Sequence, residues 1–124
     1  MDEEGAGFRH ERLDVWQKAI EWAQGIYVVS AGFPEAERFG LQAQMRRAAV
    51  SVASNIAEGA GRYTAADFAR FVEIAYGSLM ETVCQATIAH NLGYMNAHDH
   101  DRLRTQAETI ARMLSSLRRS RLSR

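Results

Sequence analysis

A single proline, Pro34, interrupts this chain of 124 residues. Proline breaks helices because its ring fixes φ, removes a backbone donor and clashes with the preceding turn. Its near absence therefore leaves long stretches in which a helix can continue. Hydrophobic residues make up 47% of the chain, which is enough for one buried core at this length. We expect one all-α domain over residues 1–124, with a flexible acidic segment over residues 1–12.

Apolar residues recur three and four positions apart in four segments, the spacing of amphipathic helices. Thr64 and Asp67 form a capping-box variant at the start of the third segment, and Asn96 is a good N-cap for the fourth. Short connections between long amphipathic helices favour an antiparallel up-down-up-down bundle. The four predicted helices cover residues 14–30, residues 38–60, a segment from Thr64 to near Gly93, and the chain after Asn96.

The formal net charge of zero conceals an asymmetry along the chain. Residues 1–14 carry two arginines against five acidic residues, a net charge of −3, whereas residues 102–124 carry seven arginines against one glutamate, a net charge of +6. Helix dipoles favour positive charge near a helix C-terminus, so part of this basic end needs no ligand to explain it. The acidic N-terminus and the lack of a long apolar run predict a cytoplasmic protein without a membrane partner.

Two predicted helices carry apolar residues outside their main stripe. In the first helix these are Val15, Trp22 and Val29, and in the third they are Gly77, Met80, Cys84 and Ile88. Large exposed apolar surfaces usually mark interfaces, so the extra residues favour self-association. The alternative is that packing within one chain covers a broader face of each helix and absorbs them.

The sequence offers little for catalysis. It has no phosphate-binding glycine loop and no nucleophile elbow, and Cys84 has no histidine or lysine three or four positions away to lower its pKa. His98 and His100 are two residues apart, so they do not share a helix face. We therefore predict no enzyme, no cofactor and no metal site. A metal-dependent module built on His90, His98 and Asp101 is retained as the weakest alternative.

The second predicted helix is rich in small residues and carries a polar row. The row consists of Ser51, Asn55, Glu58 and Arg62, spaced by four, three and four residues. Such a row can form a hydrogen-bonded network between helices or subunits, or a recognition surface. It can also be an ordinary solvated stripe.

The segment from Arg46 to Arg62, RRAAVSVASNIAEGAGR, resembles the signature of the four-helix bundle proteins encoded in intervening sequences of bacterial 23S rRNA genes. The similarity covers residues 8–95 in detail. Val52-Ala53 departs from it, because many members have a proline after the apolar residue, and we expect a straighter helix here. The further matching motifs are Leu13–Trp16, Phe33-Pro34, Glu37–Leu41, Phe68–Glu81 and Leu92–Tyr94.

This resemblance implies an antiparallel four-helix bundle assembled as a ring-like homopentamer. The family is related to the accessory variability protein of diversity-generating retroelements, which binds nucleic acid and a reverse transcriptase. We therefore predict a non-enzymatic homo-oligomer that contacts rRNA or DNA through arginines. A protein-binding scaffold, with a partner such as a reverse transcriptase, is the main alternative. The candidate nucleic-acid residues are Arg46, Arg47, Arg62, Arg70, Arg118, Arg119, Arg121 and Arg124, and the candidate family-motif or interface residues are Trp22, Ser51, Ser54, Asn55, Glu58, Gly59, Met80, Cys84 and Ile88.

Overall fold

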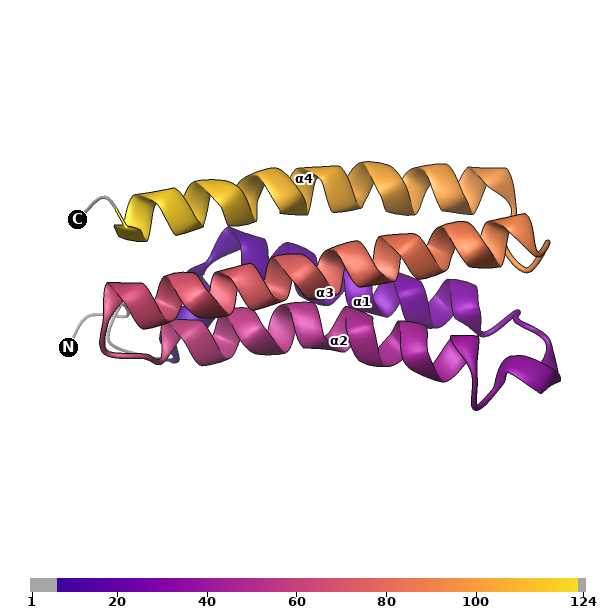
Figure 1. The fold of residues 1–124 in the computed structure, drawn as a ribbon, viewed down its shortest axis with the longest axis horizontal. Coiled ribbons are helices and arrows are strands. Elements are labelled where there is room, and N and C mark those ends of the chain that lie inside the picture. The colour runs from indigo at the N-terminus through magenta and orange to yellow at the C-terminus, as the bar shows by residue number, and fades with distance from the viewer. Residues whose placement is uncertain (1–6, 123–124) are drawn as a thin grey trace.

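The described residues, 7–122, are helical with no strand, as the sequence predicted (Figure 1). The structure is a computed structural model. Of the segment predicted to be flexible, residues 1–6 lie outside the described part, and the rest includes a short 3-10 helix. The elements in chain order are η2 (Arg9–Arg12), α1 (Asp14–Ser30), η3 (Glu35–Glu37), α2 (Leu41–Ala60), α3 (Ala65–Asn91) and α4 (Ala97–Leu122).

The four α-helices lie side by side, and each begins at the end of the molecule where the previous one finishes (Figure 1). Their backbones approach each other closely in the pairs α1–α2, α2–α3, α3–α4 and α1–α4, while the diagonal pairs stay apart within the described residues. The α2–α3 turn and the C-terminal part of α4 therefore share one end of the bundle.

Three of the helices begin with side-chain caps, which satisfy backbone N–H groups that have no partner within the helix. Thr64 Oγ1 accepts a hydrogen bond from Asp67 N at 3.0 Å, and Asn96 Oδ1 accepts one from Asp99 N at 2.7 Å. Both predicted N-caps are thus confirmed. In α2, Glu37 Oε1 accepts from Leu41 N at 3.0 Å. This cap places the start of α2 three residues after the predicted Arg38.

Trp22 lies in the core between α1 and α4. Its side chain is 2% exposed, and its indole Nε1 donates a hydrogen bond to the Leu103 carbonyl oxygen at 3.1 Å. Val15 is also buried. The prediction that Trp22 belongs to an exposed self-association stripe is therefore wrong, because α1 packs against both α2 and α4 and buries a wide arc.

Gly59 of α2 lies tightly against α3. A Cβ built on it would lie 2.8 Å from Phe71 Cβ and 3.0 Å from Phe68 Cδ1. Phe71 Cβ is fixed to the backbone and cannot rotate away. Gly59 therefore has a packing role within one chain, and the interface role predicted from the family motif is not needed to explain it.

Replacing Gly59 with alanine should destabilise the protein by about 1–3 kcal/mol, because α2 and α3 must separate to admit the methyl group. Gly25→Ala is the matched control, since a Cβ there meets only Leu103 Cδ2 at an ordinary 3.8 Å. Alanine in a helix interior is favoured over glycine by up to about 1 kcal/mol, so this variant should be slightly more stable. Urea denaturation followed by circular dichroism measures both, and equal stability of the two variants would contradict the prediction.

Candidate nucleic-acid interface

The described candidate arginines fall into two groups that are separated along the bundle. Arg46 and Arg47 lie in the first half of α2, near the α1–α2 connection. The second group, which we call the arginine end, lies around the α2–α3 turn and the last turns of α4 (Figure 1). Arg124 lies outside the described residues. The arginine end consists of Arg62, Arg70, Arg118, Arg119 and Arg121.

Two guanidinium groups of the arginine end lie against one aromatic ring. Arg62 Cζ is 4.6 Å and Arg70 Cζ is 4.9 Å from the centroid of the Phe71 ring. Each arginine also has a carboxylate partner one helical turn away, Glu58 at 4.0 Å and Asp67 at 3.9 Å. Cation–π contact and pairing together restrict the positions of these two cations.

The last turns of α4 contribute the remaining cations. Arg118 pairs with Glu73 of α3. Arg121 lies over Phe68, with Cζ 4.9 Å from the ring centroid, and its buried Nε has no hydrogen-bond partner among the described residues. Arg119 is exposed and has no ion pair within the described chain.

Three of the five arginines are thus paired with carboxylates, but these pairs are on the surface. The paired side chains are 43–61% exposed on the arginine side. Exposed ion pairs of this kind contribute only about 0–1 kcal/mol. A phosphate that approached the arginine end could therefore replace a carboxylate partner at small cost.

The other group of arginines lines an open groove of about 550 Å³ beside the α1–α2 connection. No acidic side chain lines it. Sequence reasoning identified two of its arginines but missed the arginine and the aromatic residue in the turn before α2. Adjacent arginine and phenylalanine in a short connection were the available signal. The arginine–aromatic groove, as we call it, is formed mainly by Tyr27, Arg38, Phe39, Gln42, Arg46 and Arg47.

Arg46 is largely occupied within the fold. Its Nε donates to Ser30 Oγ at 2.8 Å, its Nη2 donates to the Tyr27 carbonyl oxygen at 3.1 Å, and its Cζ lies 4.6 Å from the Tyr27 ring centroid. Gln42 Nε2 donates to the Ser30 carbonyl oxygen at 2.7 Å. These bonds add side-chain donors to two carbonyls at the end of α1, which also accept backbone hydrogen bonds from Ala31 N and Phe33 N. Arg46 therefore positions the helix end and adds a fixed charge to the groove.

Glu37 holds the connection that precedes α2. Besides capping Leu41, its carboxylate accepts a hydrogen bond from the Tyr94 hydroxyl at 3.2 Å. Burial and the adjacent Glu37 carboxylate raise the pKa of the Tyr94 hydroxyl. The Tyr94 ring also contacts Phe33, with centroids 5.7 Å apart. A Cβ at Gly40 would lie 2.9 Å from Glu37 Oε1, so glycine leaves the space that this carboxylate occupies.

Half of the predicted polar row forms a hydrogen-bonded network within one chain. Ser51 Oγ lies 2.9 Å from Ser78 Oγ of α3, and Asn55 Nδ2 donates to the Ser51 carbonyl oxygen and hydroxyl at 2.8 and 2.9 Å. The other half is the Glu58–Arg62 ion pair, and the neighbouring candidate Ser54 is exposed. The row therefore connects α2 to α3 and reaches the arginine end.

The additional apolar residues of α3 stay on the surface of the single chain. We call this surface the α3 outer face. Gly77 lies in its middle, and a Cβ built there meets nothing within 4 Å. Glycine in a helix interior is unfavourable relative to alanine, so nothing within one chain explains its presence. The α3 outer face consists of Ile74, Gly77, Met80, Cys84 and Ile88, all exposed.

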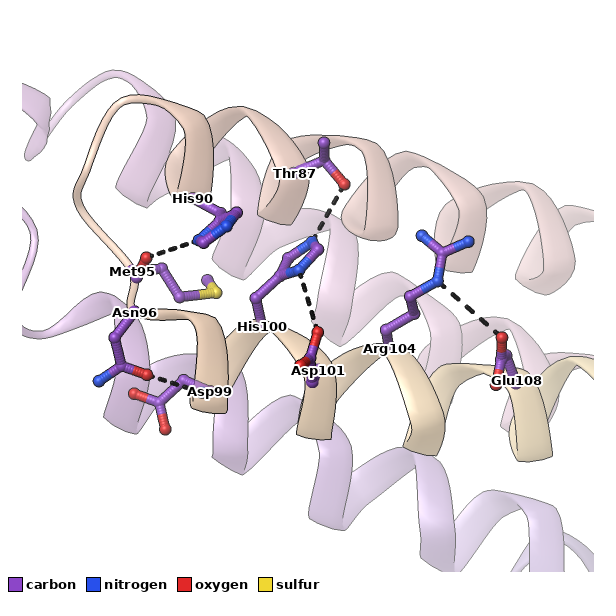
Figure 2. A network of polar contacts seen from close by, with 9 residues as sticks. All are labelled: Thr87, His90, Met95, Asn96, Asp99, His100, Asp101, Arg104 and Glu108. Atoms are coloured by element: carbon purple, nitrogen blue, oxygen red, sulfur yellow. Dashed lines mark hydrogen bonds and ion pairs between the residues drawn. The ribbon is translucent and has the colours of Figure 1, made fainter.

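The histidines at the α3–α4 turn stack on each other (Figure 2). The rings of His90 and His100 have centroids 4.7 Å apart and planes inclined by 10°. His90 Nδ1 donates to the Met95 carbonyl oxygen at 3.0 Å, and His100 Nε2 lies 3.2 Å from Thr87 Oγ1. The second nitrogen of His100, Nδ1, is 3.8 Å from Asp101 Oδ1.

These contacts also bear on the metal-dependent alternative. No group of three His, Cys, Asp or Glu side chains within residues 7–122 is arranged to hold a metal ion. His90, His98 and Asp101 are therefore not gathered into one site.

No helix within residues 7–122 combines the length and the apolarity needed to cross a bilayer.

Comparison with known proteins places this arrangement in a family. A sequence model for the 23S rRNA-intervening sequence protein matches residues 11–116. No curated protein matches the chain. A solved structure, of a protein with unknown function from the S23 ribosomal protein family of Bacteroides thetaiotaomicron, superposes with a TM-score of 0.77 at 22% identity, covering 85% of this chain and 95% of that one. It shows the same fold, and the match over residues 11–116 shows that the chain belongs to the 23S rRNA-intervening sequence protein family.

Proposed function

We propose that this protein is a non-enzymatic up-down-up-down bundle that assembles as a homo-oligomer, a ring-like homopentamer, and contacts nucleic acid through its arginine end. Membership of the 23S rRNA-intervening sequence family supports an RNA ligand, and DNA is the alternative. The observation that carries the proposal is the gathering of five arginines from the α2–α3 turn, α3 and α4 at one end of the bundle.

The chemistry of these arginines suits phosphate. A guanidinium group is planar, always charged and able to make two parallel hydrogen bonds to phosphate oxygens. Contacts with Phe68 and Phe71 fix the positions of three of the groups before a ligand arrives. Fixed cations lose less side-chain freedom on binding, which improves affinity. Phosphate contacts would then provide most of the binding free energy.

Self-association would strengthen a weak site. The α3 outer face offers an apolar surface for it, and Gly77 would allow another backbone to approach closely. Several arginine ends in one assembly would bind one long nucleic acid at several points. Linked weak contacts give an apparent affinity far above that of each site alone.

We expect binding to labelled rRNA fragments that weakens steeply with salt, because each phosphate contact releases counterions. Substituting Arg62→Gln together with Arg119→Gln should weaken binding for all sequences. It should also lower the slope of log affinity against log salt by about one for each lost phosphate contact. Fluorescence anisotropy at about 0.05 and 0.2 M salt measures both quantities.

Arg102→Gln together with Arg104→Gln is the matched control, because it also removes two charges but at the other end of α4, where Arg102 pairs with Asp99 at 3.2 Å and Arg104 with Glu108 at 3.9 Å. Its affinity and salt slope should equal those of the unmodified protein. An intact oligomer that binds no RNA or DNA at low salt would overturn the proposal. That result would favour the protein-binding scaffold, for which a nuclease-resistant complex with one protein is the positive evidence.

A further inference from the structure

The arginine–aromatic groove combines exposed aromatic surface with positive charge. Phe39 is 87% exposed, which is unusual for a large apolar side chain, and Tyr27 is 45% exposed. The Arg38 guanidinium lies beside Phe39, with Cζ 5.4 Å from the ring centroid. The groove is distinct from the arginine end, because it lies near the start of α2 and the arginine end lies beyond its last residue.

Phe39 is presented by a fixed backbone. The backbone just before Phe39 is anchored through Glu37. Its carboxylate accepts hydrogen bonds from Leu41 N and from the Tyr94 hydroxyl. Phe33, on the other side of the turn, is buried against the core. The turn that carries the Phe39 ring is therefore anchored on both sides, so a ligand that covers the ring need not first order the turn.

The three arginines of the groove differ in how strongly contacts within the fold restrict their side chains. Arg46 is fixed by its bonds to the end of α1. Arg38 has one partner, Glu35 at 3.6 Å, and both side chains are mostly exposed. Arg47 has no ion pair within the described chain. Arg38 and Arg47 can therefore turn toward an anion, with Arg46 adding to the field.

We infer that this groove binds a single-stranded segment of nucleic acid, with an unpaired base stacked on Phe39 and the adjoining phosphates on Arg47 and Arg38. The inference rests on the proposed function and names a second site and its ligand class. Sites for single strands combine aromatic faces for the bases with a positive path for the backbone, and this groove has both. A duplex offers Phe39 no base face along its length, because its interior bases stack on one another.

An acidic protein segment is the competing occupant, and the chemistry separates the two. Acidic side chains would use the three arginines but would gain little from the exposed Phe39 ring. A single-stranded nucleic acid would use both features, since its phosphates would contact the arginines and a base would stack on the Phe39 ring. The contribution of the Phe39 ring to binding is therefore the deciding measurement.

The test uses the full-length protein and fluorescence anisotropy with a short labelled oligouridine RNA, oligothymidine DNA of equal length, and an RNA duplex of equal length. Phe39→Ala should weaken binding to both single strands about tenfold and leave duplex binding unchanged. Phe39→Trp should restore single-strand binding. Arg47→Gln should weaken single-strand binding and reduce its salt slope. The RNA and DNA arms show which backbone is preferred.

Phe8→Ala is the matched control, since Phe8 is 70% exposed but lies outside the groove. It should bind like the unmodified protein. Equal effects of Phe39→Ala on single strands and duplex, no effect on either, or a change in oligomer mass would overturn the inference. If substitutions at the arginine end abolish binding while Phe39→Ala has no effect, the proposed function stands and the groove assignment fails. If Phe39→Ala weakens single-strand binding while substitutions at the arginine end have no effect, the groove is the binding site and the arginine end is not.

Discussion

Trp22→Ala is expected to destabilise the protein by about 3–5 kcal/mol, the usual cost of removing a large buried aromatic side chain. Trp22 is 2% exposed and connects two helices that are distant in sequence, through packing and through its hydrogen bond to Leu103. Small domains are stable by only about 5–15 kcal/mol, so this loss would leave a substantial unfolded fraction. Thermal and urea denaturation followed by circular dichroism measure it.

Trp22→Phe separates the two contributions. Phenylalanine keeps much of the buried area but cannot donate to the Leu103 carbonyl oxygen, so we expect a smaller loss than for alanine. Val28→Ala is the control, since Val28 is on the same helix and is 75% exposed. Its stability should change by less than about 0.5 kcal/mol. If Trp22→Ala retained full stability and changed only the oligomeric mass, Trp22 would be an interface residue after all.

Trp22 also shows where sequence periodicity stops being informative. The positions of the helices followed from apolar spacing, one proline and two N-caps, because these signals act within a few residues. Trp22 is buried because α4 lies beside α1. The spacing of apolar residues within α1 alone does not show where α4 will pack. A helix that contacts two neighbours buries a wider arc than one stripe, and residues at the edge of that arc are misassigned to the surface.

The arginines illustrate the same limit for the candidate site. Their abundance near the C-terminus was evident from the sequence, but their partners were not. Arg118 meets Glu73 across 45 positions of sequence, and Arg46 bonds the end of α1, 16 and 19 residues earlier. Such contacts are set by how helices pack. These contacts decide which arginines are available to a ligand. Arg46 is bonded within the fold, whereas Arg47 and Arg119 have no ion pair within the described residues.

The α3 outer face differs from Trp22, because its apolar residues are not buried by packing within the chain. Ile74 is 41%, Met80 39% and Ile88 44% exposed, although α3 also has two neighbouring helices. A surface of this kind along one helix is typical of an interface. A Cβ built on Gly77 in its middle would meet nothing within 4 Å, which leaves space that another subunit could fill. We therefore propose this face as the surface for the proposed self-association.

Ile88→Asp should convert the proposed oligomer into a monomer of 13.9 kDa while the helical circular dichroism signal is retained. A carboxylate buried in an apolar interface loses its hydration without a partner, and this cost falls on every contact of a ring. Size-exclusion chromatography with light scattering measures the mass. Val28→Asp is the matched control, because it places the same charge on an exposed apolar position of α1 and should leave the mass unchanged. An unaltered assembly in Ile88→Asp would place the contact on another face, whereas loss of the helical signal would show that Ile88 supports the fold of the single chain.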